Sequence, residues 1–206
     1  MLRLVGIFFV LFITGCTSMA DSFTKLAGVG VVSKEVSDFD GSKIVRVSPA
    51  HLYNPNAGML GMYTKLGGYW NSNTPELVAL ILENNSQAGY GQSYLSYQGL
   101  DINIDGKQYS YEVDGTTKFD NSGYNTVTQT IYTSSKNAVT IPYEVLKSMM
   151  TAKDCRIRIN TGNGSETAMF STERIPGGQS TAILHFREFI QAVEGDSPQS
   201  TSTPSS

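Results

Sequence analysis

A two-residue step, Asp105-Gly106, between two alternating stretches limits what this chain can fold into. Apolar and polar residues alternate over 100–104 before the step and again over 109–113 after it. Such alternation is typical of strands that bury one face. Asp-Gly between two strands is the strongest short-range signal for a tight β-hairpin. The sequence therefore predicts at least one antiparallel pair of strands.

Further strands are predicted wherever β-branched and aromatic residues gather between turn-forming residues. These stretches are 29–36, 43–47, 77–82, 124–132, 139–141, 156–160 and 167–170. The run 77–82 is continuously apolar, so we expect it to lie centrally and to be buried on both faces. Ser48-Pro49 is expected to end the predicted strand 43–47, because the proline nitrogen carries no hydrogen to donate to a neighbouring strand.

Two amphipathic helices are predicted near the C-terminal end. Pro142 suits the first position of a helix, and apolar residues follow it at helical spacing up to Met150. Over 181–193 the apolar residues recur with the same period. We therefore predict a mainly β or α+β fold, an antiparallel β-sandwich or curled sheet with two helices near its C-terminal end.

The first sixteen residues have the organisation of an export signal. Arg3 is followed by a run, 4–13, that is apolar apart from Gly6, and small residues then precede Cys16. A membrane-spanning helix needs about twenty apolar residues, so this shorter run is expected to be removed.

The ending Ile13-Thr14-Gly15-Cys16 resembles the lipobox of bacterial lipoproteins. The resemblance implies cleavage before Cys16 and attachment of fatty-acyl groups such as palmitate to its sulfur. The alternative is an ordinary signal peptide with an incidental cysteine, but such signals end in an Ala-x-Ala-like site, which is not found here. Thr17, in place of an aspartate, implies the outer membrane of a Gram-negative cell. We separately expect the domain to face the periplasm. The apolar order of the last third is also similar to uncharacterised small outer-membrane lipoproteins of Gram-negative bacteria, which implies no function.

We expect four parts along the chain. They are a signal peptide over 1–15, the lipidated cysteine and a tether over 16–26, a single β-rich domain over 27–194, and a disordered Ser/Thr/Pro tail over 195–206. Hydrophobic residues make up 40% of the chain and charged residues 16%, which suits one globular domain. The formal charge of -3 and the lack of a basic block argue against nucleic acid as a partner.

The sequence offers few groups for catalysis. Its two histidines, His51 and His185, do not have the spacing of a zinc site, and the motifs of serine hydrolases and P-loops are missing. His185 is expected to have a structural role at the boundary of the last predicted helix, in place of a catalytic one. Cys155 shares a predicted strand face with isoleucines, so we expect a buried, inert thiol. A noncatalytic binding or envelope-assembly module is therefore favoured. The alternative is a periplasmic hydrolase that acts on cell-envelope material, with His51 as its acid or base.

The glycine- and asparagine-rich stretch 54–75 is the candidate binding surface. It carries Tyr63, Tyr69 and Trp70, whose large side chains could grip an envelope protein at small entropic cost. The competing interpretation is that Trp70 and its neighbours close the end of the core.

Residues of the predicted hairpin also match a calcium-loop pattern. Asp101, Asn103, Asp105, Gly106 and Glu112 occupy positions 1, 3, 5, 6 and 12 of the EF-hand expression. The flanking stretches do not predict helices, so a solvated hairpin face is favoured over a calcium-stabilised binding domain. No cofactor is expected besides the lipid on Cys16.

Overall fold

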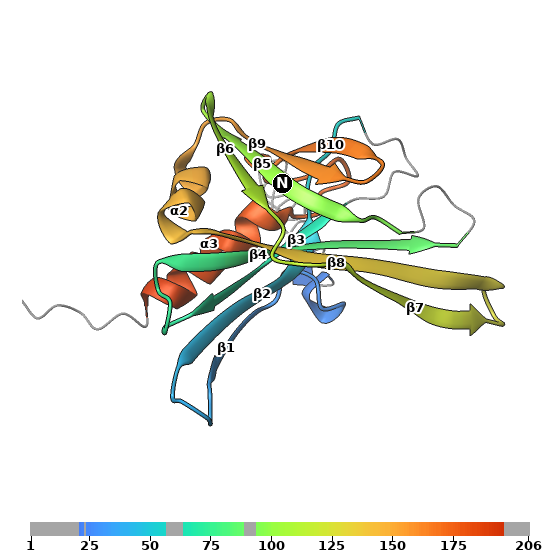
Figure 1. Cartoon of the computed structure of the whole chain (residues 1–206), viewed down its shortest axis with the longest axis horizontal. Helices are drawn as coiled ribbons and strands as arrows, with labels where there is room; N and C mark the ends of the chain where they lie inside the picture. The colour runs from blue at the N-terminus through green and yellow to red at the C-terminus, as the bar shows by residue number, and fades with distance from the viewer. Residues whose placement is uncertain (1–20, 23, 57–63, 89–93, 196–206) are drawn as a thin grey trace, which may run out of the picture.

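The computed structural model describes residues 21–22, 24–56, 64–88 and 94–195. Within this part of the chain, ten strands form two antiparallel sheets (Figure 1). The strands are β1 (Val32–Val36), β2 (Lys43–His51), β3 (Lys65–Asn71), β4 (Leu77–Gln87), β5 (Tyr97–Ile104), β6 (Lys107–Glu112), β7 (Lys118–Asn125), β8 (Thr130–Pro142), β9 (Cys155–Thr161) and β10 (Gly164–Met169). One sheet has the order β1-β2-β3-β4-β8-β7 and the other β10-β9-β5-β6. The predicted mainly β, antiparallel fold is confirmed.

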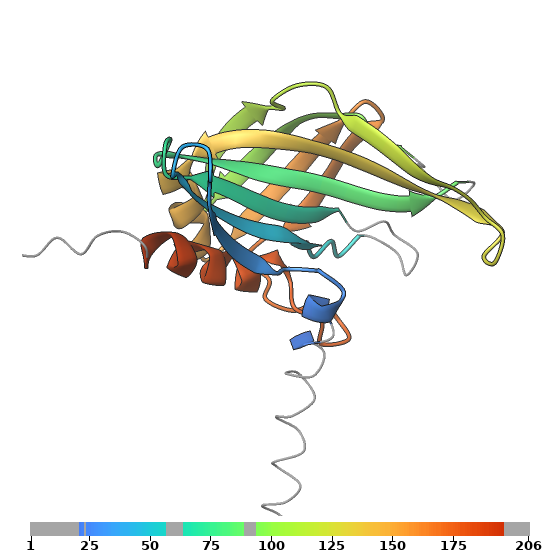
Figure 2. The same cartoon turned by 90° about the horizontal axis from the view of Figure 1, so that it is seen from below.

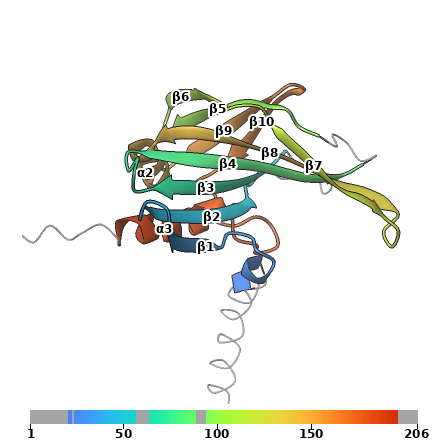
Figure 3. The ribbon, with the colours of Figure 1, turned by 60° about the horizontal axis from the view of Figure 1, so that its bottom comes forward.

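Helix α3 (Ala182–Glu194) and the four-stranded sheet share one face of the six-stranded sheet. Helix α3 contacts β1, β2 and β3, while β5 and β6 contact β8, and Figures 2 and 3 show α3 running beneath the first strands of the curled sheet. Apolar residues of both sheets and α3 belong to a single buried cluster. We call the face of the six-stranded sheet that turns toward this cluster the inner face.

The hairpin around Asp105-Gly106 is confirmed. Strands β5 and β6 pair in register from Gly99↔Glu112 to Ile104↔Lys107. Asp105 has φ 49° and Gly106 has φ 93°, the left-handed pair that a two-residue hairpin turn requires.

Strand β4 is central, as expected, but it is not fully buried on both faces. Val78, Leu80 and Leu82 are buried on the inner face, whereas Ala79 and Ile81 on the other face are only half-buried. The reason is that the four-stranded sheet and α3 both lie on the inner side.

The stretch 54–75 contains β3, a strand that the sequence did not predict. Gly67 and Gly68 gave no strand signal because glycine has no side chain to pack, yet both are needed here. A Cβ on Gly67 would lie 2.8 Å from the carbonyl oxygen of Val47, and one on Gly68 would lie 3.0 Å from the ring of Phe186. The two glycines therefore let β2 and α3 approach β3 closely.

Strand β2 continues through Pro49 to His51, so the prediction that Ser48-Pro49 closes it was wrong. The pairing of β2 with β3 shifts register between Val47 and Ala50. The missing N–H of Pro49 falls inside this irregularity, where a regular ladder bond is not required.

The predicted strand 124–132 is interrupted by a turn: residues 124–125 end β7, 126–129 form the turn of a long hairpin, and 130–132 begin β8. The side chain of Asn125 accepts hydrogen bonds from the N–H groups of Val127 and Thr128, and Gln129 has φ 52°. These local bonds compete with a continuous strand. The hairpin of β7 and β8 projects beyond the body of the domain (Figure 1); we call it the β7–β8 arm.

Both predicted helices are confirmed. Helix α2 (Tyr143–Thr151) follows Pro142, which is its N-cap residue, and buries Leu146 and Met149. Helix α3 buries the apolar stripe that was expected of it. Cys155 is also buried, as expected, and burial raises the pKa of its thiol to about 12.

Phe186 packs α3 against β3 of the six-stranded sheet. It is fully buried and makes edge-to-face contacts with Phe170 and Phe189, both at 5.7 Å between ring centroids. We expect Phe186→Ala to lower the free energy of unfolding by about 3–5 kcal/mol, because it leaves a cavity against β3. Arg187→Ala, one residue further on the exposed face, should change it by less than about 0.5 kcal/mol. Urea denaturation measures both, and equal losses would contradict this role of Phe186.

Candidate functional site

A groove lies on the outer face of the six-stranded sheet, opposite the inner face. It has a volume of about 500 Å³, which is within the range of ligand-binding pockets. Strands β2, β3, β4 and β8 form it together with the residues just before and at the start of β1. The outer groove is lined by Val31, Ser33, Arg46, Val47, Ser48, Pro49, Gly68, Tyr69, Ala79, Ile81 and Lys136.

The sheet register places Tyr69 at the centre of one wall. Tyr69 pairs with Arg46 on β2 and with Ala79 on β4. The guanidinium carbon of Arg46 lies 5.2 Å from the centroid of the Tyr69 ring, a cation–π distance. The small side chain of Ala79 lies beside this stacked pair. The floor of the groove at Ala79 is therefore lower than the Tyr69 ring that forms its wall.

Small neighbours leave Ile81 accessible on the floor of the groove. Ile81 pairs with Gly67 on one side and Ala138 on the other. Glycine has no side chain and alanine only a methyl group, so neither residue covers Ile81. Val31, at one end of the groove, is 36% exposed. The floor is thus a short apolar strip that could accept one or two apolar side chains.

Charged side chains border this strip. Lys65, Glu83 and Lys136 are directly opposite one another on β3, β4 and β8, with the Glu83 carboxylate 3.9 Å from Lys65 and 3.4 Å from Lys136. Arg46 forms an ion pair of 2.6 Å with Glu35. Three basic groups therefore border the groove beside two acidic ones.

The structure separates the three aromatic residues of the predicted binding surface. Tyr69 lines the outer groove. Trp70 points to the inner face, is 8% exposed and donates its indole N–H to the carbonyl of Pro75 at 3.0 Å, so the interpretation that it closes the core is confirmed. Tyr63 lies outside the described residues, as does Cys16. Alternation along a strand could have separated Tyr69 from Trp70, had 65–71 been recognised as one.

The residues of the calcium pattern occupy the hairpin of β5 and β6. The Asp101 carboxylate accepts hydrogen bonds from Ser110 at 2.7 Å and Asn160 at 3.1 Å, and these bonds lower its pKa. Asn103 accepts from the N–H of Gly106.

Asp105 and Glu112 lie apart from this cluster of bonds. The Asp105 carboxylate accepts from the N–H groups of Lys153 and Asp154, and Glu112 is opposite Gly99 at the far end of the hairpin. The interpretation of these residues as a hairpin is thus confirmed, with three of the four oxygen-bearing side chains bonded to protein donors.

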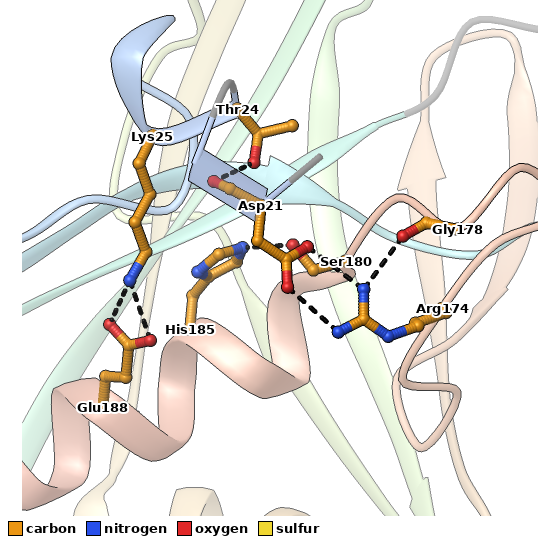
Figure 4. A network of polar contacts seen from close by, with 8 residues as sticks. All are labelled: Asp21, Thr24, Lys25, Arg174, Gly178, Ser180, His185 and Glu188. Carbon is orange, nitrogen blue, oxygen red and sulfur yellow. Dashed lines mark hydrogen bonds and ion pairs between the residues drawn. The ribbon is translucent and has the colours of Figure 1, made fainter. Parts of the chain in front are cut away.

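A buried hydroxyl–imidazole contact lies at the start of α3 (Figure 4). Ser180 Oγ is 3.1 Å from His185 Nε2, and both residues are 2% exposed. A serine beside a histidine is how many hydrolases begin to activate a nucleophile. Here, however, a Cβ added to Gly30 would lie 2.4 Å from the His185 ring. The chain covers the imidazole directly, and the contact serves packing instead of a substrate.

His51, the candidate acid or base, ends β2 opposite Lys65. Burial lowers the pKa of its imidazole, and the charge of Lys65 lowers it further. This environment favours the neutral imidazole over the imidazolium.

Across residues 21–22, 24–56, 64–88 and 94–195, three or more His, Cys, Asp or Glu side chains nowhere gather as they would around a metal ion. No helix in this described part has the length and apolar character needed to cross a membrane. Comparisons with protein-family models, curated proteins and solved structures find no match to this chain.

The two histidines predict how stability depends on pH. Burial lowers the folded-state pKa of both His51 and His185 below the ordinary 6.5. Below pH 6.5 the unfolded chain therefore binds more protons than the folded domain, and the free energy of unfolding should fall as the pH falls.

His185→Gln should remove part of this fall between pH 7.5 and pH 5, and His51→Gln another part. Urea denaturation across this pH range measures each slope. An unchanged slope in His185→Gln would show that His185 does not contribute.

Proposed function

We propose that this protein is an outer-membrane lipoprotein that faces the periplasm and acts as a noncatalytic binding module, with the outer groove as the site for an envelope protein. The observation that carries this proposal is the groove itself, an apolar floor with an aromatic wall on a sheet face that no described element covers. A contiguous apolar patch with a polar rim is typical of interaction sites.

The anchoring part of the proposal rests on the sequence. Arg3, the run 4–13 and Cys16 occur in the order of a lipoprotein signal. One acyl chain holds a protein weakly at a membrane, whereas two or more hold it stably. A lipidated Cys16 would therefore keep the groove at the membrane permanently.

The partner follows from the chemistry of the groove. Ile81 and Ala79 favour an apolar side chain, and Tyr69 stacked on Arg46 provides a rigid aromatic contact. With three bordering bases beside two acids, an acidic residue near the inserted side chain is favoured. We therefore propose an envelope protein segment that presents an apolar residue next to an acidic one.

Cys16→Ala tests the anchor. The full-length protein should fractionate with membranes and carry acyl groups on Cys16 by mass spectrometry, whereas the variant should carry none, because no other acyl attachment is proposed. Cys155→Ser is the matched control and should fractionate like the unaltered protein. Lipid-free Cys16 in the unaltered protein would refute the anchor.

Ala79→Gln tests the groove. A longer side chain at this half-buried position should fill the floor beside Tyr69 and abolish capture of the partner in in-cell crosslinking, while the fold persists because the position is on the outer face. Thr167→Gln, on an exposed position of β10, is the matched control and should retain capture. If Ala79→Gln, still folded by circular dichroism, captures the same protein in the same yield, the groove is not the binding site.

A further inference from the structure

The chain just before β1 is docked on the end of the domain where α3 begins (Figure 4). Arg174 donates two hydrogen bonds to the Asp21 carboxylate, at 3.1 and 2.9 Å, and a third to the carbonyl of Gly178 at 2.9 Å. The hydrogen bond from Arg174 is the main reason that the pKa of Asp21 is lowered. Paired planar contacts of this kind fix orientation as well as distance.

A second ion pair and apolar packing continue the attachment. Lys25 Nζ lies 2.9 Å from both carboxylate oxygens of Glu188 on α3. Val29 packs against the core cluster, and Gly30 lies against His185. Asp21 and Lys25, which lie in the predicted tether over 16–26, are therefore held against the domain.

Because the chain is docked at Asp21, little free chain remains between the domain and the proposed lipid. Asp21 follows Cys16 by five residues, and five residues span at most about 18 Å when fully extended. A free tether that ran to residue 26 would let the domain turn in any direction. A chain docked from Asp21 onward does not.

We infer that the end of the domain formed by 21–22, 24–30, the turn 174–180 and the first turn of α3 is its membrane-facing surface, in contact with the lipid headgroups. The inference rests on the lipid anchor of the proposed function. The partner is the lipid surface itself.

The chemistry of this surface is compatible with contact to lipid headgroups. Its charges occur as the pairs Asp21–Arg174, Lys25–Glu188 and Arg187–Glu173, so no unbalanced acidic group would repel the headgroups. Leu26 is 83% exposed at the same end, where an apolar side chain can enter the headgroup region.

The experiment measures which end of the anchored domain meets the lipid. A coumarin-bearing amino acid replaces either Pro176, exposed in the turn that holds Asp21 through Arg174, or Gln108, exposed on β6. Figure 3 shows β6 and the blue segment before β1 on opposite sides of the domain. The lipidated protein is placed in vesicles of phosphatidylethanolamine and phosphatidylglycerol that contain a nitroxide-labelled headgroup as quencher. We expect a loss of fluorescence at 176 and none at 108. Equal losses at the two positions, or a loss only at 108, would overturn the inference.

A pair of variants tests the docking. Asp21→Asn with Lys25→Gln removes both ion pairs and should abolish the difference between the two reporters, because the domain is then free to turn. Glu144→Gln with Lys147→Gln removes an ion pair of 2.6 Å on α2 and should preserve the difference. If the docking variant preserves it as well, the docked segment does not orient the domain.

Failure of the anchor gives a distinct result. Mass spectrometry that finds no lipid on Cys16 refutes the proposed function alone. A maleimide-linked lipid on Cys16 then supplies the anchor, since the buried thiol of Cys155 is unreactive, and the two reporters decide the inference in the same way.

Discussion

The burial of one face of the six-stranded sheet beneath both α3 and the four-stranded sheet is the interaction on which the rest of this structure depends. The two covers are complementary, because α3 contacts β1 to β3 whereas the second sheet contacts β8. Phe186 joins the two regions by contacting Phe170 and the backbone of Gly68. Because both covers lie on the same side, the opposite face stays bare, and the outer groove is a result of that one-sided arrangement.

The same packing explains why His185 is buried whereas the ion pairs near Asp21 lie at the surface. Burial beside Gly30 lowers the pKa of His185, whereas the charged pairs near Asp21 lie at the rim of α3 and hold the preceding chain. Exposed ion pairs contribute little to stability. Their effect here is geometric, because they decide where the polypeptide leaves the domain.

Local sequence signals predicted the elements that depend on local chemistry. The Asp105-Gly106 hairpin, the helices and the buried Cys155 follow from turn residues and periodicity within short stretches. Strand β3 was missed because Gly67 and Gly68 are explained only by their neighbours in space, the carbonyl of Val47 and the ring of Phe186. The groove was beyond sequence reasoning for a related reason: its walls come from strands whose pairing is long-range, so Arg46 and Lys136 could not be placed beside Tyr69.

The projecting β7–β8 arm has a consequence for self-association. Strand β7 is an edge, and exposed backbone along an edge can template the addition of strands from other molecules, which leads to aggregation. Its pairing with β8 shifts register between Asn121 and Tyr124, and Lys118 and Asp120 place charges along it. An interrupted, charged edge is a poor template. The arm can thus extend from the domain with Phe119 and Tyr124 exposed and still resist fibre growth.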